Sequence, residues 1–372
     1  MKRSISVLLA LKFLLVCLVG CAGNADNEVL DSTVADTRAE DSTVSTTDDT
    51  TPDTTDKTEN DPKDEYEPVN MWTYSTKNGI KVRDLVIETE KGGEELEIMM
   101  MTDLHLSWVN DTDLADPVIA DTYKSRTWGK NGAHWSNAER CLNFAKDADQ
   151  IVLTGDIYDY ITSETVKRVE ENIFAKYDNL MACLGNHEGV KAMGEEKTWT
   201  EDTVKERMEF LSGVWKNNVY YSSKVLGDKV MLIQMDNAVT GKFWDCQVEP
   251  FEADLKRARE NGYAVLIFYH VPIATYNPRF YNTKALYVGD RQYFNFATEG
   301  ATKYGQTADA KICSLIVNNG DIIKGTFCGH FHSDFYSEII ATCPSGEEVL
   351  IPQYVLTGTP YDNGHVLRIT VK

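Results

Sequence analysis

Five short polar clusters in this 372-residue sequence each follow directly on an apolar run. In chain order they are Asp103-Leu104-His105, Gly155-Asp156-Ile157-Tyr158-Asp159, Gly185-Asn186-His187-Glu188, His270-Val271-Pro272 and Gly329-His330-Phe331-His332. Five of the seven histidines in the chain lie in these clusters. Histidines scattered through a hydrophobic core would not gather in this way, so we expect the clusters to form one site. We expect the other two, His134 and His365, to be hydrogen-bonded core residues.

The side chains in the clusters form a mixed set of nitrogen and oxygen donors. The candidate ligands are four histidines, two aspartates and one asparagine: Asp103, His105, Asp156, Asn186, His270, His330 and His332. A donor set without sulfur is typical of Mn, Fe, Zn or Co, and the lack of a Cys-x-x-Cys pair argues against a thiolate zinc site. Seven donors are enough for two ions if one carboxylate bridges them.

Two metal ions ~3.5–4 Å apart can clamp both the attacking and the leaving oxygen of a phosphoryl displacement. That is the chemistry which the clusters favour. An alternative for Asp103 and Asp156 is a helix N-cap after each strand, but their glycine and histidine neighbours make that role secondary. We expect Glu188 to brace its turn rather than to bind metal.

Apolar runs and amphipathic stretches alternate through the part of the chain that carries the clusters. The runs predict strands at Leu96–Thr102, Gln150–Thr154, Asn179–Leu184, Val230–Met235, Ala264–Tyr269 and Ile323–Cys328. The amphipathic stretches predict helices at Asn137–Ala148, Glu164–Lys176, Thr203–Lys216, Pro250–Asn261 and Ala308–Asn318. This alternation predicts βαβ units in one α/β domain, with the clusters converging at one edge of a sheet, at the carboxyl ends of its strands.

After the last cluster the pattern becomes hairpin-like, with strands predicted at Phe335–Thr342, Val349–Leu356 and Val366–Val371. Two long segments between clusters, Ser107–Trp135 and Pro272–Gln306, are expected to be loops over the site. Their aromatic residues could stack on a base or a sugar ring, with Arg279 or Arg291 reaching a phosphate. The alternative, which we favour, is that these aromatic side chains pack the loops; they include Trp108, Trp128, Trp135, Tyr276, Phe280, Tyr281, Tyr287, Tyr293, Phe294 and Phe296.

The ordered series Asp-x-His, Gly-Asp-x-x-Asp, Gly-Asn-His-Glu, His-x-Pro and Gly-His-x-His resembles the calcineurin-like metallophosphoesterase superfamily. The resemblance extends from about Leu96 to His332, and it is specific because all five motifs occur in the family's order. It implies a β-sandwich of two mixed sheets flanked by helices, an α/β/β/α arrangement. Tyr158 stands one residue before the position at which the purple acid phosphatase branch has a tyrosine ligand, so a purple site is not expected.

The resemblance also implies a role for each motif residue. Asp103, His105 and His332 match ligands of the first metal ion, whereas Asn186, His270 and His330 match ligands of the second. Asp156 matches the carboxylate that bridges the two ions. His187 matches a histidine that lies beside the ions without ligating them and serves the leaving oxygen, and Asp159 matches the carboxylate that orients it. An Asp–His pair is what general-acid catalysis needs.

The expected function is therefore hydrolysis of a phosphate ester or anhydride by in-line attack of a metal-bound hydroxide, with a phosphorylated small molecule as substrate. Two alternatives remain: a surface module that binds without turnover, and a nuclease. The formal net charge is −21, of which residues 24–68 supply −12 and the first twenty residues +3, leaving −12 for the rest. Such an acidic domain disfavours duplex nucleic acid as a partner, since phosphate binding requires basic patches.

The first twenty residues are typical of a secretory signal, with Lys2 and Arg3 before a short apolar stretch. The tetrapeptide Leu18-Val19-Gly20-Cys21 resembles the lipobox of bacterial lipoproteins, which implies a lipid on Cys21 and an extracytoplasmic protein anchored to the cell membrane. The alternative is an ordinary signal peptide with a chance cysteine. Residues 21–68 are predicted to be a disordered acidic tether, because 24–68 carry fifteen acids against three bases and few large apolar residues. Residues 69–372 are the predicted phosphoesterase domain, in which Cys183 and Cys328 are expected to be buried thiols.

Overall fold

The computed structural model of the protein describes residues 73–126, 129–192, 194–275, 294–296 and 308–372. The chain divides into two units after Pro68, and the second of them, Val69–Lys372, carries all of the described elements. The predicted signal, Cys21 and the tether lie outside the described residues, as do Trp128, Arg279 and Arg291. Among the described residues, no helix is long and apolar enough to cross a membrane.

The first of two six-stranded sheets has the strand order β1-β2-β14-β3-β4-β5. Its parallel part, β3-β4-β5, carries three of the five clusters at its carboxyl ends, while β14 runs antiparallel to β3 and parallel to β2. The strands are β1 (Thr73–Lys77), β2 (Ile80–Ile87), β3 (Leu96–Met101), β4 (Gln150–Thr154), β5 (Leu180–Cys183) and β14 (His365–Val371).

The second sheet has the order β12-β13-β11-β8-β7-β6 and also has a parallel centre, β13-β11-β8-β7, with an antiparallel strand at each edge. The other two clusters follow β8 and β11. The strands are β6 (Tyr221–Leu226), β7 (Val230–Met235), β8 (Ala264–Phe268), β11 (Ile323–Cys328), β12 (Phe335–Thr342) and β13 (Glu348–Val355). A separate parallel pair joins β9 (Ile273–Thr275) to β10 (Phe294–Phe296).

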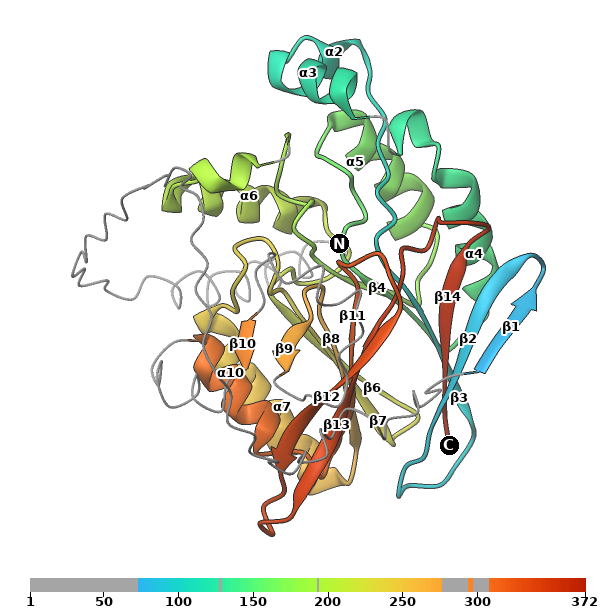
Figure 1. The fold of residues 1–372 in the computed structure, drawn as a ribbon, viewed down its shortest axis with the longest axis vertical. Helices are drawn as coiled ribbons and strands as arrows, with labels where there is room; N and C mark the ends of the chain where they lie inside the picture. Colours follow the sequence, from blue (N-terminus) through green and yellow to red (C-terminus); the bar gives the residue numbers. More distant parts are fainter. Residues whose placement is uncertain (1–72, 127–128, 193, 276–293, 297–307) are drawn as a thin grey trace, which may run out of the picture. The chain divides into compact units, whose positions relative to one another are not determined.

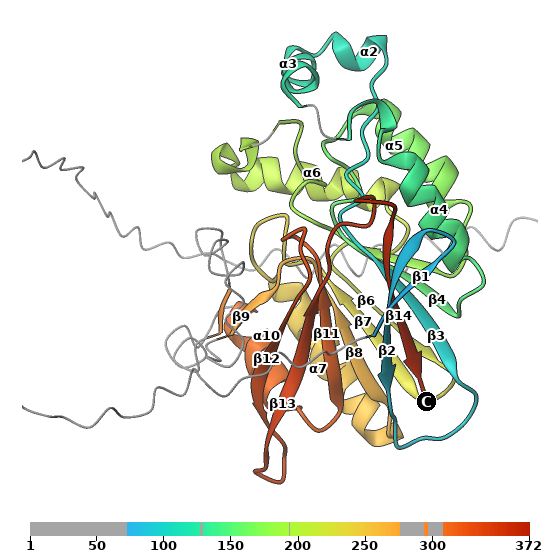
Figure 2. The same cartoon turned by 45° about the vertical axis from the view of Figure 1, so that its right-hand side comes forward.

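The two sheets face each other across a shared apolar core, to which they contribute Ile98, Met100, Val152, Leu232, Leu266, Phe268, Phe327, Leu367 and Ile369, among others. The outer face of the first sheet packs against α4 (Trp135–Ala145), α5 (Ser163–Val169) and α6 (Glu201–Val214). The outer face of the second packs against α7 (Asp245–Asn261) and α10 (Ala308–Val317). Figures 1 and 2 show these helices on opposite sides of the sheet pair. The fold that the resemblance implied, two mixed sheets flanked by helices, is confirmed.

The shorter helical segments lie in the connections. They are α2 (Asp111–Leu114), α3 (Pro117–Ser125), the 3₁₀ turns at Lys130–Gly132 and Glu195–Thr198, and a π-helical turn at Glu170–Phe174 that continues α5. Helix α7 begins earlier than the predicted Pro250, because the Gln247 side chain accepts a hydrogen bond from the Trp244 backbone at 2.8 Å and caps the helix there. It ends at Gly262, whose φ of 67° suits a glycine C-cap.

The expectation that all clusters meet at one edge of a single sheet was wrong. The described strands of the two large sheets number twelve, six in each, and an open twisted sheet rarely exceeds ~10 strands without splitting. Val366–Val371 was also placed wrongly in a hairpin with the preceding strands. It inserts as β14 into the first sheet, where Val366, Leu367 and Ile369 are fully buried.

Five of the described strands were not predicted. Two of them, β9 and β10, are three residues long and lie in the Pro272–Gln306 segment, which was wrongly expected to be a loop throughout. The other three are too polar to form an apolar run. β1 and β6 are edge strands with the sequences TYSTK and YSSKVL, whereas β2 contains Lys81, Arg83 and Asp84. The thiols of Cys183 and Cys328 are buried as predicted.

Candidate metal centre

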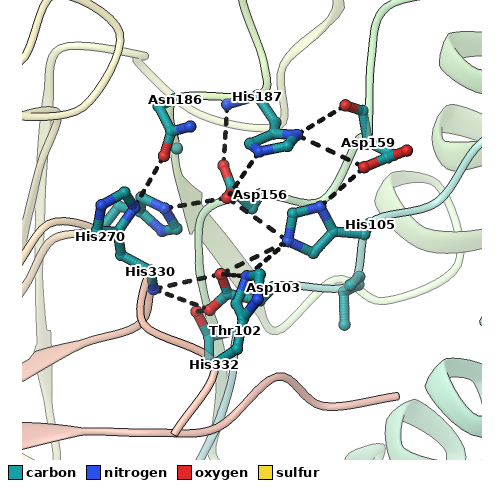
Figure 3. A network of polar contacts seen from close by, with 12 residues as sticks. Thr102, Asp103, His105, Asp156, Asp159, Asn186, His187, His270, His330 and His332 are labelled. Atoms are coloured by element: carbon teal, nitrogen blue, oxygen red, sulfur yellow. Dashed lines mark hydrogen bonds and ion pairs between the residues drawn. The ribbon is translucent and has the colours of Figure 1, made fainter. Parts of the chain in front are cut away.

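The five clusters converge on one place although they come from two sheets. Figure 3 shows the side chains from the ends of β3, β4 and β5 facing those from the ends of β8 and β11. Asp103, His105, Asp156 and His270 are fully or almost fully buried, whereas the rest of the set is partly exposed: Asn186, His187, His330 and His332. The partly exposed residues therefore line the side from which a substrate can approach.

One group of ligand atoms is formed by Asp103, His105, Asp156 and His332, all of which lie within 4.8 Å of one another. Nε2 of His332 is 3.0 Å from Asp103 Oδ1 and 3.0 Å from Nε2 of His105. Nε2 of His105 is also 3.6 Å from Asp156 Oδ2. Nitrogen lone pairs and carboxylate oxygens thus point at a common volume.

A second group is formed by Asp156, His270 and His330. Nε2 of His270 lies 3.2 Å from Asp156 Oδ2, and Nδ1 of His330 lies 2.9 Å from the side-chain oxygen of Asn186. Asp156 is the one residue common to both groups. The two groups together contain six of the seven side chains that the sequence singled out as candidate ligands, and the seventh, Asn186, contacts the second group through His330.

The orientation of His270 indicates what the second group can hold. Its Nδ1 donates to the Thr154 carbonyl at 2.7 Å, so that the lone pair of the neutral ring is on Nε2. Nε2 is buried and has no hydrogen-bond partner in the described part of the chain. An orphaned acceptor beside a carboxylate is what a metal ion satisfies, and the mixed N/O donors suit Mn, Fe, Zn or Co. The residues present therefore fit two metal ions.

A third set of groups, His187 with Asp159, lies beside the first two. Nδ1 of His187 donates to the backbone carbonyl of Asp159 at 2.7 Å and is 3.6 Å from its carboxylate. Burial acts to lower the pKa of His187, but the carboxylates of Asp156 and Asp159 outweigh it and raise the pKa to about 9. Arg126 already binds the carboxylate of Asp159, so this set is a poorer cation site than the other two.

The backbone at the candidate ligands is strained. Five of them have a positive φ: Asp103 at 51°, His105 at 44°, Asp156 at 51°, His330 at 74° and His332 at 51°. Each such residue costs of order 1–3 kcal/mol, and residues of this kind concentrate at functional sites. The other described non-glycine residues with positive φ are Asn or Asp. Asn, Asp and His are the residue types that adopt this conformation most often.

Two glycines of the motifs allow a close approach. A Cβ at Gly185 would collide with the carboxylate and the backbone nitrogen of Asp156, and one at Gly329 would collide with Thr102 and the Asp103 carboxylate. Any larger residue at either position would displace a candidate ligand.

Glu188 ties two of the cluster turns together. Its buried carboxylate accepts hydrogen bonds from the backbone nitrogens of Asp156 at 3.0 Å, Ile157 at 2.5 Å and Tyr158 at 3.2 Å, and from that of Gly185 at 2.5 Å. It belongs to neither group of candidate ligands. These contacts are those of the bracing residue that the sequence predicted.

The model of the calcineurin-like phosphoesterase family matches residues 96–334, more than half of the chain. The chain belongs to this family. Its members use dinuclear metal ions, in agreement with the two groups of ligand atoms that share Asp156.

The solved structures found by comparison resemble the chain only distantly. A dimetal phosphatase from Danio rerio is 12% identical, with a TM-score of 0.43, over 71% of this chain and 87% of that one. PhoD is 10% identical, with a TM-score of 0.40, over 76% and 60%. The NAD nucleotidase of Haemophilus influenzae is 12% identical, with a TM-score of 0.33, and the match spans 71% of this chain but 45% of that one. The comparison with curated proteins found no match. Family membership therefore rests on the family model.

Two residues that support the site were not predicted from the sequence. Arg126, in the Ser107–Trp135 segment, binds the Asp159 carboxylate with Nε at 2.9 Å. Asn237, which follows β7, exchanges two hydrogen bonds with the backbone of Val271, the neighbour of His270. Arg126 stands in no motif and could not have been found. Asn237 could have been, because Asp236-Asn237 also follows a buried strand.

The two histidines outside the clusters belong to neither group of candidate ligands. His365 is buried and contacts Arg83 at 2.9 Å, as expected of a core histidine. His134 contacts the Leu104 carbonyl at 3.2 Å but is partly exposed, so it is not a core residue. Trp108 and Trp135 are partly buried and pack against the core of the first sheet, which agrees with the packing role that we favoured for them. The predicted Arg279 and Arg291 contacts lie outside the described residues. Tyr158 is buried in the core, edge-on to Trp215, away from the candidate ligands.

Proposed function

We propose that this chain is a two-metal phosphoesterase that hydrolyses phosphate esters or anhydrides outside the cytoplasm. The observation that carries the proposal is the position of Asp156, whose carboxylate is shared by two groups of ligand atoms contributed by opposite sheets. Bound metal ions at such a pair of sites supply Lewis-acid stabilisation of the phosphoryl group and an activated water for in-line attack.

The proposal assigns a role to each cluster residue. Asp103, His105 and His332 hold the first ion, Asn186, His270 and His330 hold the second, and Asp156 binds both. Burial acts to raise the pKa of Asp103 and of Asp156, but the surrounding histidines outweigh it and hold both pKa values well below the usual range. Both carboxylates are therefore ionised and able to bind metal at neutral pH.

His187 is the proton donor in this proposal. Its Nδ1 is fixed on the Asp159 carbonyl, and its Nε2 lies 3.8 Å from Asp156 Oδ2, at the partly exposed side of the site. With a pKa of about 9 the ring is protonated at neutral pH. It can therefore give a proton to the leaving oxygen, while Asp159 steadies the imidazolium.

The substrate proposed is a small, hydrophilic phosphorylated molecule. A cavity of about 710 Å³ adjoins the site at His332, and its lining in the described part of the chain contains no Ala, Val, Leu, Ile or Met. Its walls are Tyr74, Ser75, Thr76, Lys81, Arg83, Ser333, Asp334, Thr357 and His365. A volume of this size is in the range of small-molecule sites, and its polar lining suits the non-reacting part of such a substrate. The acidic domain disfavours duplex nucleic acid.

The proposed activity is tested by stripping the protein of metal and reloading it with Mn, Fe, Zn or Co. Each form is then assayed against chromogenic phosphate monoesters, diesters and pyrophosphates. We expect hydrolysis that appears only on reloading, with two ions bound per chain. Two bound ions without turnover of any substrate would instead favour a binding module on the same fold, and cleavage of nucleic acid alone would favour a nuclease.

The extracytoplasmic location is likewise a proposal, supported by the Leu18-Val19-Gly20-Cys21 sequence. A lipid on Cys21 would place the mature protein in the membrane fraction, with residues 21–68 as its tether. The variant Cys21→Ser should be released from the membrane or remain unprocessed. Mass spectrometry of the mature wild-type protein tests this directly, since an unmodified Cys21 would contradict the lipid anchor.

A further inference from the structure

The carboxylate of Asp159 is fully buried, and three nitrogen-bearing side chains surround it. Its Oδ1 lies 3.2 Å from Nδ1 of His105 and 3.6 Å from Nδ1 of His187. Arg126 makes a two-pronged contact, with Nε donating to Oδ2 at 2.9 Å and a terminal amino group donating to Oδ1. Bidentate pairs of this kind fix the orientation of a carboxylate as well as binding it.

His105 has its two ring nitrogens in different surroundings. Nδ1 faces Asp159, whereas Nε2 faces the first group of ligand atoms, 3.0 Å from His332 Nε2 and 3.7 Å from Asp103 Oδ1. A histidine that ligates a metal through one nitrogen usually donates the other N–H to a carboxylate or carbonyl, which fixes the tautomer and strengthens the ligand. The Asp159 carboxylate is placed to do this for His105, whereas His187 already has a closer acceptor in the Asp159 carbonyl.

Arg126 places a permanent positive charge beside the buried Asp159 carboxylate. A fully buried carboxylate is costly unless a cation compensates it, and a histidine that ligates a metal is neutral. Among the described residues that contact Asp159, Arg126 is the one permanent cation, since a guanidinium stays protonated at any physiological pH. With 24% of its side chain exposed, Arg126 reaches this buried acid from the surface.

Arg126 belongs to the insertion after the first cluster, which is docked on the neighbouring turns at several points. Arg126 directly follows α3, and Asp116, which caps the other end of α3, binds Lys191 at 2.9 Å. Asp113 of α2 accepts from the Ser163 backbone at 2.8 Å and so caps α5. Figure 1 shows α2 and α3 beside α5, above the sheet ends that carry the clusters. The insertion is therefore tied to the two turns that carry Asp159 and His187.

We propose that Arg126 is a positioning residue for the first metal: it holds the Asp159 carboxylate where it accepts the Nδ1–H of His105, and so keeps Nε2 of His105 directed at the metal. The inference rests on the proposed function and deepens it, because it gives the insertion a part in building the site. Arg126 itself touches neither the metal nor the reacting atoms.

The test is the affinity of the metal-stripped protein for Mn²⁺, measured by isothermal titration calorimetry. Arg126→Ala should weaken one of the two binding steps by about 10–100-fold, the usual effect of removing a partner of a ligating histidine. The other step should change little. Arg126→Lys should recover part of the loss, since lysine keeps the charge without the two-pronged contact. Asp159→Asn should weaken the same step as Arg126→Ala.

The matched control is Asp116→Asn, which removes the ion pair between the insertion and Lys191 without touching Asp159. It should leave both binding steps within about twofold of the wild type. Equal weakening of both steps in Arg126→Ala, or the same loss in Asp116→Asn, would show that the insertion acts only through general stability. Unchanged affinity in Arg126→Ala and Arg126→Lys would also overturn the role of Arg126. A different result would contradict the proposed function, namely that the wild-type protein binds fewer than two ions.

Discussion

Replacement of Asp156 by asparagine should abolish metal-dependent hydrolysis and should lower the occupancy of both metal sites. The carboxylate lies between the two groups of ligand atoms, 3.6 Å from Nε2 of His105 and 3.2 Å from Nε2 of His270. An amide retains the shape of the side chain but not the negative charge, so both ions lose the same ligand. Metal content per chain and hydrolysis of a chromogenic ester after reloading are the measurements.

The fold should survive this change, because the candidate ligands stand in turns after strands that are buried without them. The control is Asp103→Asn, which removes a carboxylate from the first group only and should cost one ion rather than two. If Asp156→Asn kept two ions and its activity, the bridging assignment would be wrong. If Asp103→Asn lost both ions as readily, the two groups would not be separable sites.

Truncation of His187 to alanine should lower the rate by ~10²–10⁴-fold, the usual contribution of a general acid, while both metal ions stay bound. His187 belongs to neither of the two groups that share Asp156, and its Nδ1 is engaged by the Asp159 carbonyl at 2.7 Å. The loss should be largest for alkoxide leaving groups of high pKa, which need a proton. It should shrink for nitrophenolate, which leaves readily as the anion.

Two variants sharpen this test. His134→Ala removes a histidine that contacts a backbone carbonyl beside the site, and it should leave the rate nearly unchanged. Asp159→Asn should give a smaller defect than His187→Ala, because the Asp159 carbonyl that fixes the ring remains. Loss of metal in His187→Ala would make the residue a ligand. An equal defect for good and poor leaving groups would replace proton donation with electrostatic stabilisation of the phosphoryl group.

The local signals of the sequence located most of the elements that carry the site. β4, β7 and β11 have the predicted bounds. β4 and β7 are mainly apolar and buried throughout, β11 is buried except at Lys324, and each of the three is followed by a polar or glycine residue. Three of the strands that were missed, β1, β2 and β6, carry polar side chains at a sheet edge or beside one. Their identity as strands depends on the neighbours that they pair with, which a single-chain pattern does not contain.

The chemistry of the site was determined by the sequence alone, because the donor types and the order of the five motifs are local properties. Which donors share an ion was decided by the tertiary structure. Asp103 and His332 are far apart in the chain and lie in different sheets, yet their side chains meet at 3.0 Å because the two sheets pack face to face through one core. The same packing placed Arg126 on Asp159 and the Asp159 carboxylate on His105. These contacts cannot be predicted from a motif. Arg126 follows a short surface helix, and it has a role only because the fold brings the buried Asp159 beside it.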